Sequence, residues 1–365
     1  MPRARTMPDI WILLSTLLIL AIGVIMVYSA SAVLALHDFG DSFYYVKRQL
    51  VFALLGVAAM LVMLRIDYWA WKKVALYGLL ACFGLLVLVL IPGVGVVRGG
   101  ARSWLGIASL GIQPSEFMKL AMIIFMAKTL SSPDFRIQSF RHGLLPLLAV
   151  LGAAFGLIML QPDLGTGAVL LGATMMVIFS AGARLSHLAG LAAVGLVGFV
   201  GLIAAAPYRL QRITAFLDPW QDPLGAGYQA IQSLYAIGPG GLVGLGLGMS
   251  RQKYSYLPEP QTDFIFSIIA EELGFIGGAF VLVLFLLLVW RGMRTAITAP
   301  DSFGSLLAVG IVGMIAVQVI INIGVVTGMM PVTGITLPLV SAGGSSLTLM
   351  LTAIGILLNI SRYAR

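Results

Sequence analysis

Apolar residues in this chain form long continuous runs, separated by short stretches of charged residues, proline and glycine. A helix that crosses the hydrocarbon core of a bilayer needs about 20 mostly apolar residues. The runs therefore predict ten membrane-spanning helices, at residues 10–34, 49–66, 73–91, 114–130, 143–161, 166–182, 187–206, 263–290, 304–327 and 341–361. We expect an all-α integral membrane protein in which residues 1–365 form a single helical bundle.

The composition supports this prediction. Of the 365 residues, 60% are hydrophobic and 10% are charged, whereas an ordinary soluble domain has roughly 25% charged residues. The net charge of +8 comes mostly from basic residues that flank the apolar runs, so we interpret them as topology signals and contacts to anionic lipids rather than a nucleic-acid site. The single cysteine, Cys82, excludes an internal disulfide and a cysteine-ligated zinc centre, and we expect it to pack in the core.

The distribution of lysine and arginine predicts the orientation. These residues are more numerous on the cytoplasmic side when both termini are placed in the cytoplasm, as the positive-inside rule requires. The long segment 207–262 then lies outside, and its content of Pro, Gly, Trp and Tyr argues against a disordered linker. Within it we predict a short surface helix over Gly227–Ile237, either as a structural cap or as an element that shapes the substrate site or docks a partner.

Ionisable residues near the membrane are the best candidates for chemistry, because each costs about 2.5 kcal/mol or more on insertion scales unless it has a partner, a wet cavity or a role. Glu116 and Lys119 share one helical face at the start of the fourth span, just after Gln113. Asp163 lies in a short turn, and Asp263 opens the eighth span. Each carboxylate also has a structural interpretation as a helix cap. All three fall at predicted outer ends, and we expect them to converge on one outward-facing cavity.

Positive charge is predicted on the same side, where it would suit a pyrophosphate or another anion. The residues concerned are Arg48, Arg98, Arg102, Arg209, Arg212 and Lys253. Glu271 and Glu272 follow Asp263 on a predicted continuous helix, about 12 to 13 Å deeper at a rise of 1.5 Å per residue. We expect at least one of them to point into the bundle, paired or protonated.

Three other patterns are informative. His37, His142 and His187 fall on different sides of the membrane, so a three-histidine metal site is not expected. The glycine-rich run 238–248 lacks the spacing of a nucleotide loop, which favours close helix packing or a re-entrant turn. The Gly-, Pro- and Thr-rich run 322–346 lies between apolar helices, so its backbone must pack against protein or line a wet cavity.

Four ordered motifs together resemble the SEDS family of shape, elongation, division and sporulation proteins (FtsW, RodA and SpoVE). They are Gln113–Lys119, Pro162–Thr166, Tyr256–Phe266 with Glu271–Gly274, and Asn322–Ser346. The similarity covers essentially the whole chain. Further segments are similar to the branch of FtsW and stage V sporulation protein E, namely Met26–Val33, Ile91–Gly95 and Ser361–Tyr363. The chain departs from the family pattern at Ala342 and Met249.

This resemblance implies a ten-helix peptidoglycan glycosyltransferase that polymerises lipid II outside the cytoplasmic membrane, in spore cortex synthesis or septal division. It implies a class B penicillin-binding protein transpeptidase as partner, and Asp263 as the essential acid that serves as general base. The predicted substrate-binding residues are Arg48, Arg102, Gln113, Glu116, Lys119, Asp163 and Lys253. The resemblance implies no definite cofactor, and a divalent cation, Mg²⁺ or Mn²⁺, is the candidate that would help the pyrophosphate to leave.

Two other functions are compatible with these features. A flippase or transporter for lipid II would also place acids along a polar path through the bundle, but that path would continue to the inner face. A non-catalytic scaffold of a cell-wall complex would keep its function after the substitution Asp263→Ala.

Overall fold

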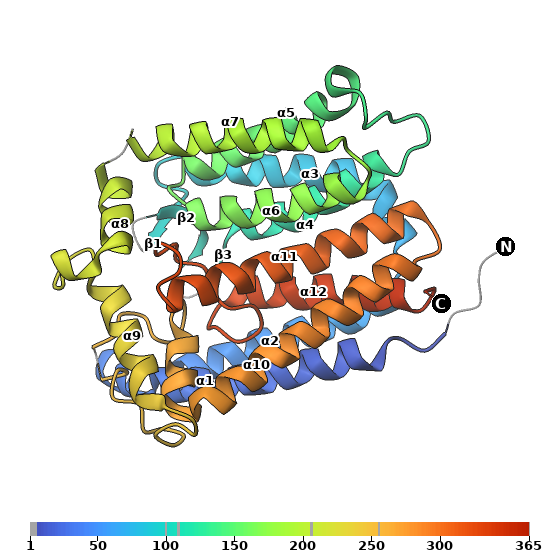
Figure 1. Ribbon diagram of the computed structural model, residues 1–365. Coiled ribbons are helices and arrows are strands. Elements are labelled where there is room, and N and C mark those ends of the chain that lie inside the picture. The colour runs from blue at the N-terminus through green and yellow to red at the C-terminus, as the bar shows by residue number, and fades with distance from the viewer. Residues whose placement is uncertain (1–5, 99–100, 108–109, 205–206, 255, 365) are drawn as a thin grey trace.

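The computed structural model describes residues 6–98, 101–107, 110–204, 207–254 and 256–364. Figure 1 shows the long helices running roughly side by side, with both chain termini at one end of the bundle. We call this end the terminal end. The opposite end carries α8, α9 and a small sheet, and we call it the loop end.

Each predicted span corresponds to a helix of the bundle. These helices are α1 (Ile10–Phe39), α2 (Tyr44–Arg65), α3 (Trp69–Leu90), α4 (Pro114–Leu130), α5 (Leu145–Met159), α6 (Leu164–Ser180), α7 (Leu185–Ala204), α10 (Ile265–Thr298), α11 (Ser302–Val326) and α12 (Gly344–Ser361). Among the described residues, seven helical stretches are long and apolar enough to cross a membrane; α4, α6 and α7 do not meet that test. The predicted class, an all-α membrane protein, is confirmed. The count of ten spans stays a prediction.

Helix α12 lies in the core of the bundle and packs against α2 through small residues. A side chain at Gly56 of α2 would collide with Leu351, and one at Gly355 of α12 would collide with the backbone of Met60. Glycines at such positions let two helix backbones approach closely, which is how membrane helices gain packing contacts. In α12, 78% of the residues are buried, more than in the other candidate spans among the described residues.

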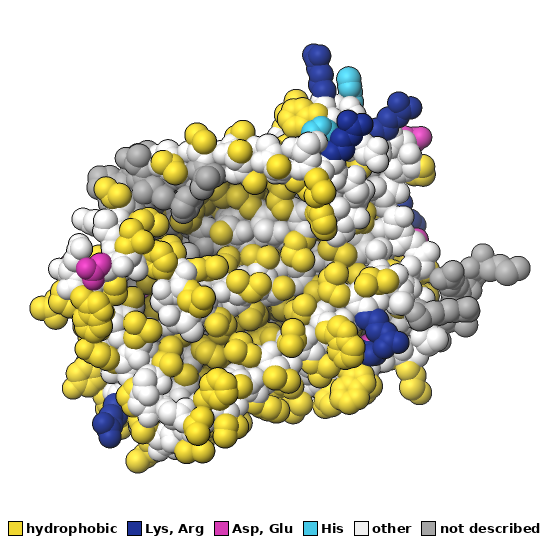
Figure 2. All heavy atoms as spheres, in the orientation of Figure 1, with side chains coloured by type: hydrophobic (Ala, Val, Ile, Leu, Met, Phe, Trp, Pro, Cys, Tyr) yellow, Lys and Arg dark blue, Asp and Glu magenta, His cyan; other side chains and the backbone are white. Residues whose placement is uncertain are grey.

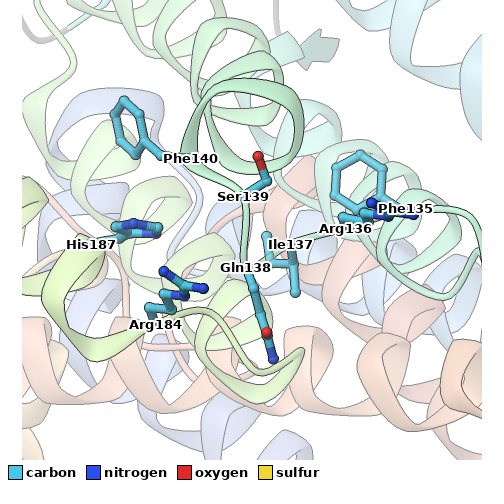
Figure 3. Close-up of a pocket in the computed structure, with 8 residues that line it drawn as sticks. All are labelled: Phe135, Arg136, Ile137, Gln138, Ser139, Phe140, Arg184 and His187. Carbon is cyan, nitrogen blue, oxygen red and sulfur yellow. The ribbon is translucent and has the colours of Figure 1, made fainter.

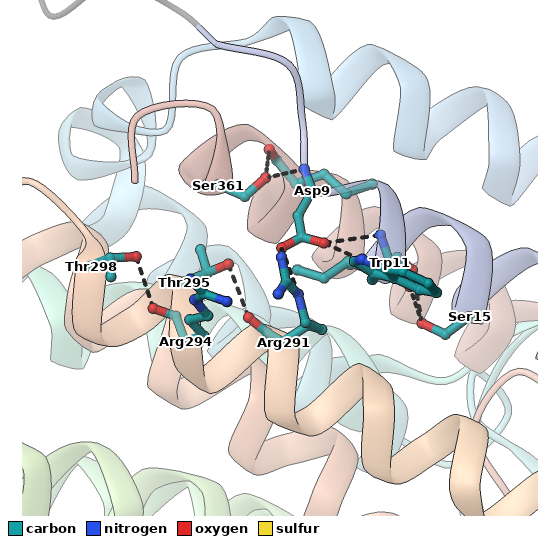
Figure 4. A network of polar contacts seen from close by, with 10 residues as sticks. Asp9, Trp11, Ser15, Arg291, Arg294, Thr295, Thr298 and Ser361 are labelled. Carbon is teal, nitrogen blue, oxygen red and sulfur yellow. Dashed lines mark hydrogen bonds and ion pairs between the residues drawn. The ribbon is translucent and has the colours of Figure 1, made fainter. Parts of the chain in front are cut away.

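At the terminal end, one carboxylate ties three helices together (Figure 4). Asp9 caps α1 by accepting hydrogen bonds from the backbone N–H groups of Trp11 and Ile12. Its Oδ2 also pairs with Arg291 of α10 at 2.5 Å, and its backbone N–H donates to Ser361 Oγ of α12 at 3.0 Å. The cap therefore fixes the start of α1 against both neighbouring helices.

The loop end contains elements that the hydrophobic pattern did not predict. Between α3 and α4, an antiparallel sheet forms from β1 (Val96–Arg98), β2 (Ala101–Ile107) and β3 (Leu110–Ile112), with η1 (Phe140–Leu144) preceding α5 at the other end. The segment after α7 folds into α8 (Pro207–Leu217), η2 (Pro219–Gln221) and α9 (Tyr228–Gly240). The predicted helix over Gly227–Ile237 is confirmed as α9. Residues 205–206, the end of the predicted span 187–206, lie outside the described residues.

The prediction of one continuous helix from residue 263 onward is wrong, because α10 is interrupted at Gly274. There φ is 65° and ψ is −167°, a combination open essentially to glycine alone. The backbone of the glycine-rich run packs against this break: Phe275 N–H donates to Gly241 O at 2.8 Å, and Ile276 N–H donates to Leu242 O at 3.0 Å. The run is therefore a close-packed turn, as expected.

Candidate functional site

The start of α4 places a buried ion pair at the loop end. Pro114 occupies the first turn, where its missing N–H costs nothing. Lys119 Nζ lies 2.8 Å from Glu116 Oε1, and the two side chains are 1% and 7% exposed. Lys119 also donates to Gln318 Oε1 of α11 at 3.2 Å. Because a buried charge needs a partner, the lysine links α4 and α11 as well as neutralising Glu116.

Asp163 sits beside this pair as the N-cap of α6. Its Oδ1 accepts the backbone N–H of Thr166 at 3.0 Å, and its Oδ2 accepts a hydrogen bond from Gln113 Nε2 at 3.0 Å. Burial raises the pKa of the Asp163 carboxyl above its ordinary value, the bond from Thr166 lowers it, and the charge of Glu116 raises it. A carboxyl whose pKa is raised at a cluster of charges is a candidate for proton transfer or substrate contact.

Asp263 lies in the turn before α10 and is half-buried. Asn322 Nδ2 of α11 donates to the backbone oxygen of Asp263 at 2.8 Å and to that of Ile335 at 2.6 Å. A side chain at Gly334, where φ is 73°, would place its Cβ 3.5 Å from Asp263 Oδ2. The Asp263 carboxylate therefore lies against the segment between α11 and α12, which we call loop 327–343.

Loop 327–343 brings the separate acids into one neighbourhood. Gln318 Nε2 donates to Thr336 O at 3.0 Å, and a Cβ on Gly165, at the start of α6, would lie 2.9 Å from Thr333 O. Residues 333–336 thus pass between the Asp163 end of α6 and Asp263. The backbone of this run is packed against protein, as expected for irregular backbone at membrane depth. We call the connected set the polar network: Gln113, Glu116, Lys119, Asp163, Asp263, Gln318 and Asn322.

Two of the predicted cations, Arg48 and Arg102, lie at the loop end on α2 and β2. Arg48 is half-buried near the start of α2, and its neighbour Gln49 donates to Ser341 O at 3.1 Å. Arg102 is half-buried in β2, where it is paired in register with Val97. The side chains of Arg98, Arg209 and Arg212 lie outside the described part of the chain.

Lys253 is placed differently from the other predicted site residues. Its ammonium is buried and lies 3.2 Å from Glu272 Oε1. Glu272 also accepts from Ser29 Oγ at 2.6 Å, and Glu271 accepts from Ser250 Oγ at 2.5 Å. The structure thus gives Lys253 a structural role, holding the segment before α10 to the helix; its contact to substrate stays a prediction.

The same contacts correct the expected position of the two glutamates. Both lie on the short helical stretch 265–273 that precedes the break at Gly274, and residues of the loop end cover both carboxylates. Both are buried and both have hydrogen-bond partners, so the expectation that at least one is paired is confirmed.

Sequence analysis did not identify Gln318, and it noted Asn322 only within a glycine-rich run. The available signal was their spacing: two amides four residues apart lie on one face of a helix. On a helix as apolar as α11, such a face must meet polar partners. Here those partners are the Lys119 ammonium and the backbone oxygens of loop 327–343.

A cavity of about 340 Å³ adjoins the polar network at the loop end. Its walls are residues 215–220, parts of α9 and residues 327–332 of loop 327–343. The three carboxylates of the network do not line it, although Gly334 of the same loop lies next to Asp263 and Thr333 lies next to the start of α6. The structure therefore brings the acids together around a loop, with the cavity next to them.

The residues present do not fit a resident divalent cation. Within the described ranges there is no group of three or more His, Cys, Asp and Glu side chains that could hold a metal ion. Glu116, the most buried acid of the network, is already neutralised by Lys119. We therefore derive no chemical step through a metal.

The fold and the polar network define a polytopic helical membrane protein whose buried acids gather at one end of the bundle. A family model described as "Cell cycle protein", for FtsW, RodA and SpoVE, matches residues 10–365. The chain belongs to the FtsW/RodA/SpoVE family.

Individual relatives agree with this assignment. The chain is 61% identical over 365 residues to stage V sporulation protein E of Bacillus subtilis (strain 168), covering 100% of both chains. It is 47% identical over 353 residues to the probable peptidoglycan glycosyltransferase FtsW of Trichlorobacter lovleyi, covering 97% of this chain and 93% of that protein.

Solved structures show the same fold. A chain from a peptidoglycan synthase complex, studied for the coordination of polymerization and crosslinking, matches with a TM-score of 0.80 and 34% identity, covering 97% of this chain and 98% of that chain. The crystal structure of the rod shape determining protein RodA from Thermus thermophilus matches with a TM-score of 0.71 and 31% identity, covering 97% of both chains.

Proposed function

We propose that this protein is a peptidoglycan glycosyltransferase that polymerises lipid II into glycan strands at the outer face of the cytoplasmic membrane. One observation carries the proposal: Asp263, whose backbone oxygen accepts a hydrogen bond from Asn322, lies next to Gly334, and Thr333 of the same loop lies next to the start of α6. The names of the FtsW relatives support the reaction class. Residues far apart in the chain thus form a single polar network at the loop end.

In the proposed reaction, the 4-hydroxyl of one lipid-linked sugar attacks the anomeric carbon of another. A new C–O bond forms as the bond to undecaprenyl pyrophosphate breaks, with inversion at that carbon. Asp263 accepts the hydroxyl proton as general base, a role typically worth about 10² to 10⁴ in rate. The leaving pyrophosphate carries away the bonding electron pair, and Arg48 and Arg102 lie at the same end to bind it.

The other members of the network act as binding and positioning residues in this proposal. Gln113 and Asp163 present polar atoms from two elements to the sugar headgroup. The Glu116–Lys119 pair keeps this network polar without a net charge of its own, because each partner neutralises the other. The lipid tails stay in the bilayer beside the helices, which explains why a membrane bundle would catalyse this reaction.

The position of the two glutamates favours polymerisation over lipid II translocation. A flippase needs a polar path from the loop end to the terminal end. In the sequence, Glu271 and Glu272 were the main candidates for polar groups deep along such a path. In the structure their carboxylates instead bind Ser250 and Lys253 of the loop end. A scaffold role is distinguished by experiment, since it does not need the Asp263 carboxylate.

We propose a class B penicillin-binding protein as partner, supported by the similarity to a chain from a synthase complex. We also propose that the loop end faces outward and both termini face the cytoplasm. Cys82 is buried, so single cysteines introduced at exposed positions report the orientation. A membrane-impermeant maleimide should label Met249→Cys but not Arg294→Cys in intact cells; the opposite pattern contradicts this topology.

The test of function uses purified full-length protein, with and without the partner transpeptidase, incubated with labelled lipid II. Asp263→Asn should abolish glycan chains while leaving folding and partner binding intact. Asp38→Asn is the matched control, because Asp38 is exposed and lies at the end of α1 outside the network. Full polymerisation by Asp263→Asn rejects the assigned base, and translocation without polymer formation would favour the flippase.

A further inference from the structure

A second cavity lies at the terminal end of the bundle, away from the polar network. Its volume is about 650 Å³, within the roughly 300 to 1,000 Å³ that small-molecule sites occupy. Its walls are the connection between α4 and α5, at residues 135–140, and the start of α7. The proposed glycosyl transfer does not use it.

Figure 3 shows how the lining side chains are arranged. Arg184 and His187, one turn apart at the start of α7, form one wall, and the segment that carries Gln138 and Ser139 forms the other. The His187 ring meets the Phe140 ring edge to face, with centroids 5.4 Å apart. His187 Nδ1 is buried without a hydrogen-bond partner in the structure. A buried polar atom without a partner calls for one from a ligand or water.

The charge around this cavity is strongly positive. Arg136 and Arg184 both line it, and neither forms an ion pair with an acidic side chain among the described residues. Within residues 131–144 and 181–187 the single acidic residue is Asp134, whereas Arg141 and His142 add further basic groups. Figure 2 shows Lys or Arg side chains and His side chains gathered at one corner of the molecule. Unpaired arginines beside a cavity favour an anionic ligand.

Exposed apolar side chains lie at the cavity or next to its lining residues in the chain. Phe140 and Leu145 are 44% and 45% exposed, and Leu185 at the start of α7 is 71% exposed. Side chains of this kind next to basic groups are typical of a membrane interface, where acyl chains meet headgroups. A soluble phosphate would gain nothing from these contacts, whereas a lipid would.

We propose that this cavity binds the headgroup of an anionic phospholipid from the surrounding leaflet. Arg184 and His187 bind the phosphate, Gln138 and Ser139 hydrogen-bond to headgroup oxygens, and an acyl chain lies along Leu185. Basic pockets between membrane helices are suited to such headgroups. The site is independent of the proposed reaction at the other end of the bundle.

The test measures lipid retention by the full-length protein in native mass spectrometry, without lipid II. The probes are phosphatidylglycerol, phosphatidylcholine and the soluble compound sn-glycerol 1-phosphate. Arg184→Gln should weaken phosphatidylglycerol binding about fivefold, as expected for one basic group at a membrane surface. The matched control is Arg294→Gln, which removes an exposed arginine at the same end on α10 and should leave the bound lipid in place. Gln138→Glu, which adds a negative charge to an exposed lining residue, should weaken binding by a similar factor.

Each alternative outcome overturns the proposal. Equal weakening by Arg184→Gln and Arg294→Gln would mean general surface attraction without a site. Equal retention of phosphatidylcholine would exclude selection for anionic lipid. Displacement of phosphatidylglycerol by sn-glycerol 1-phosphate at comparable concentration would identify a site for soluble phosphate. Unchanged thermal unfolding of the variants shows that any loss of binding is not a loss of fold.

Discussion

Replacing Lys253 with methionine removes one partner of a fully buried ion pair. Lys253 is 5% exposed and Glu272 is 0% exposed. Breaking a buried pair by removing one partner costs about 3 to 5 kcal/mol, because the remaining charge stays in a low-dielectric site. Glu272 keeps two sources of hydrogen bonds, Ser29 Oγ at 2.6 Å and the Ser250 N–H at 3.2 Å. We therefore expect Lys253→Met to lower the free energy of unfolding by about 3 kcal/mol, the lower end of this range.

The chain supplies its own probe for this measurement. Cys82 is the single cysteine and is buried in α3, so a thiol-reactive dye becomes fluorescent as the protein unfolds on heating. Lys253→Met should lower the unfolding temperature clearly. The double variant Lys253→Met with Glu272→Gln should recover much of the loss, because it no longer buries an unpaired charge.

Lys47→Met is the matched control. Lys47 pairs with Asp41 at 2.7 Å, but the two side chains are 69% and 38% exposed, and exposed ion pairs contribute little to stability. A Lys253→Met variant that unfolds at the wild-type temperature would refute the structural role. Loss of lipid II polymerisation in such a stable variant would instead support the substrate contact that the sequence predicted.

Three further predictions use the same unfolding assay. Arg291→Met should cost about 2 kcal/mol, because the charge-assisted bonds to Asp9 that join α1 and α10 are lost; an unchanged midpoint would contradict this. Gly274→Ala should cost about 1 to 3 kcal/mol, because the backbone conformation at the α10 break is strained for any side chain; a more stable variant would show that the break is not required. The raised pKa of Asp163 means that the folded state holds this proton more tightly than the unfolded state, so stability falls as pH rises from the ordinary pKa of aspartate to the raised value. Asp163→Asn should therefore stabilise the protein at pH 7 and flatten this pH dependence, and an equal slope in both proteins would refute it.

The hydrophobic pattern predicted the helices of the bundle because lipid imposes a length and an apolar composition on each span. It did not predict the elements at the loop end. The sheet between α3 and α4 is built from strands of three to seven residues, too short for a clear alternating pattern. Helix α8 lies within a segment that was expected to be a loop with one short helix.

In the candidate site, contacts between residues close in sequence were predictable, and contacts between residues far apart in sequence were not. The Glu116–Lys119 pair follows from helical spacing alone, and the sequence predicted it. The pairing of Lys253 with Glu272 depends on the break at Gly274 and on the fold of residues 241–253 against it, which no local pattern encodes. Asn322 could be linked to Asp263 only once the packing of α11 against the turn before α10 was known.

The burial of α12 has a consequence for how the protein is made. Its glycine-lined contact with α2 joins segments separated by nearly the whole chain, so the core cannot close until the last helix has entered the membrane. Until that moment, the face of α2 around Gly56, which carries no large side chain there, is exposed to lipid or to other helices. Contacts between residues this distant in sequence also form slowly. A newly synthesised chain therefore has an incomplete core for a time. During that time membrane chaperones and proteases can bind the exposed helix faces before α12 packs against them.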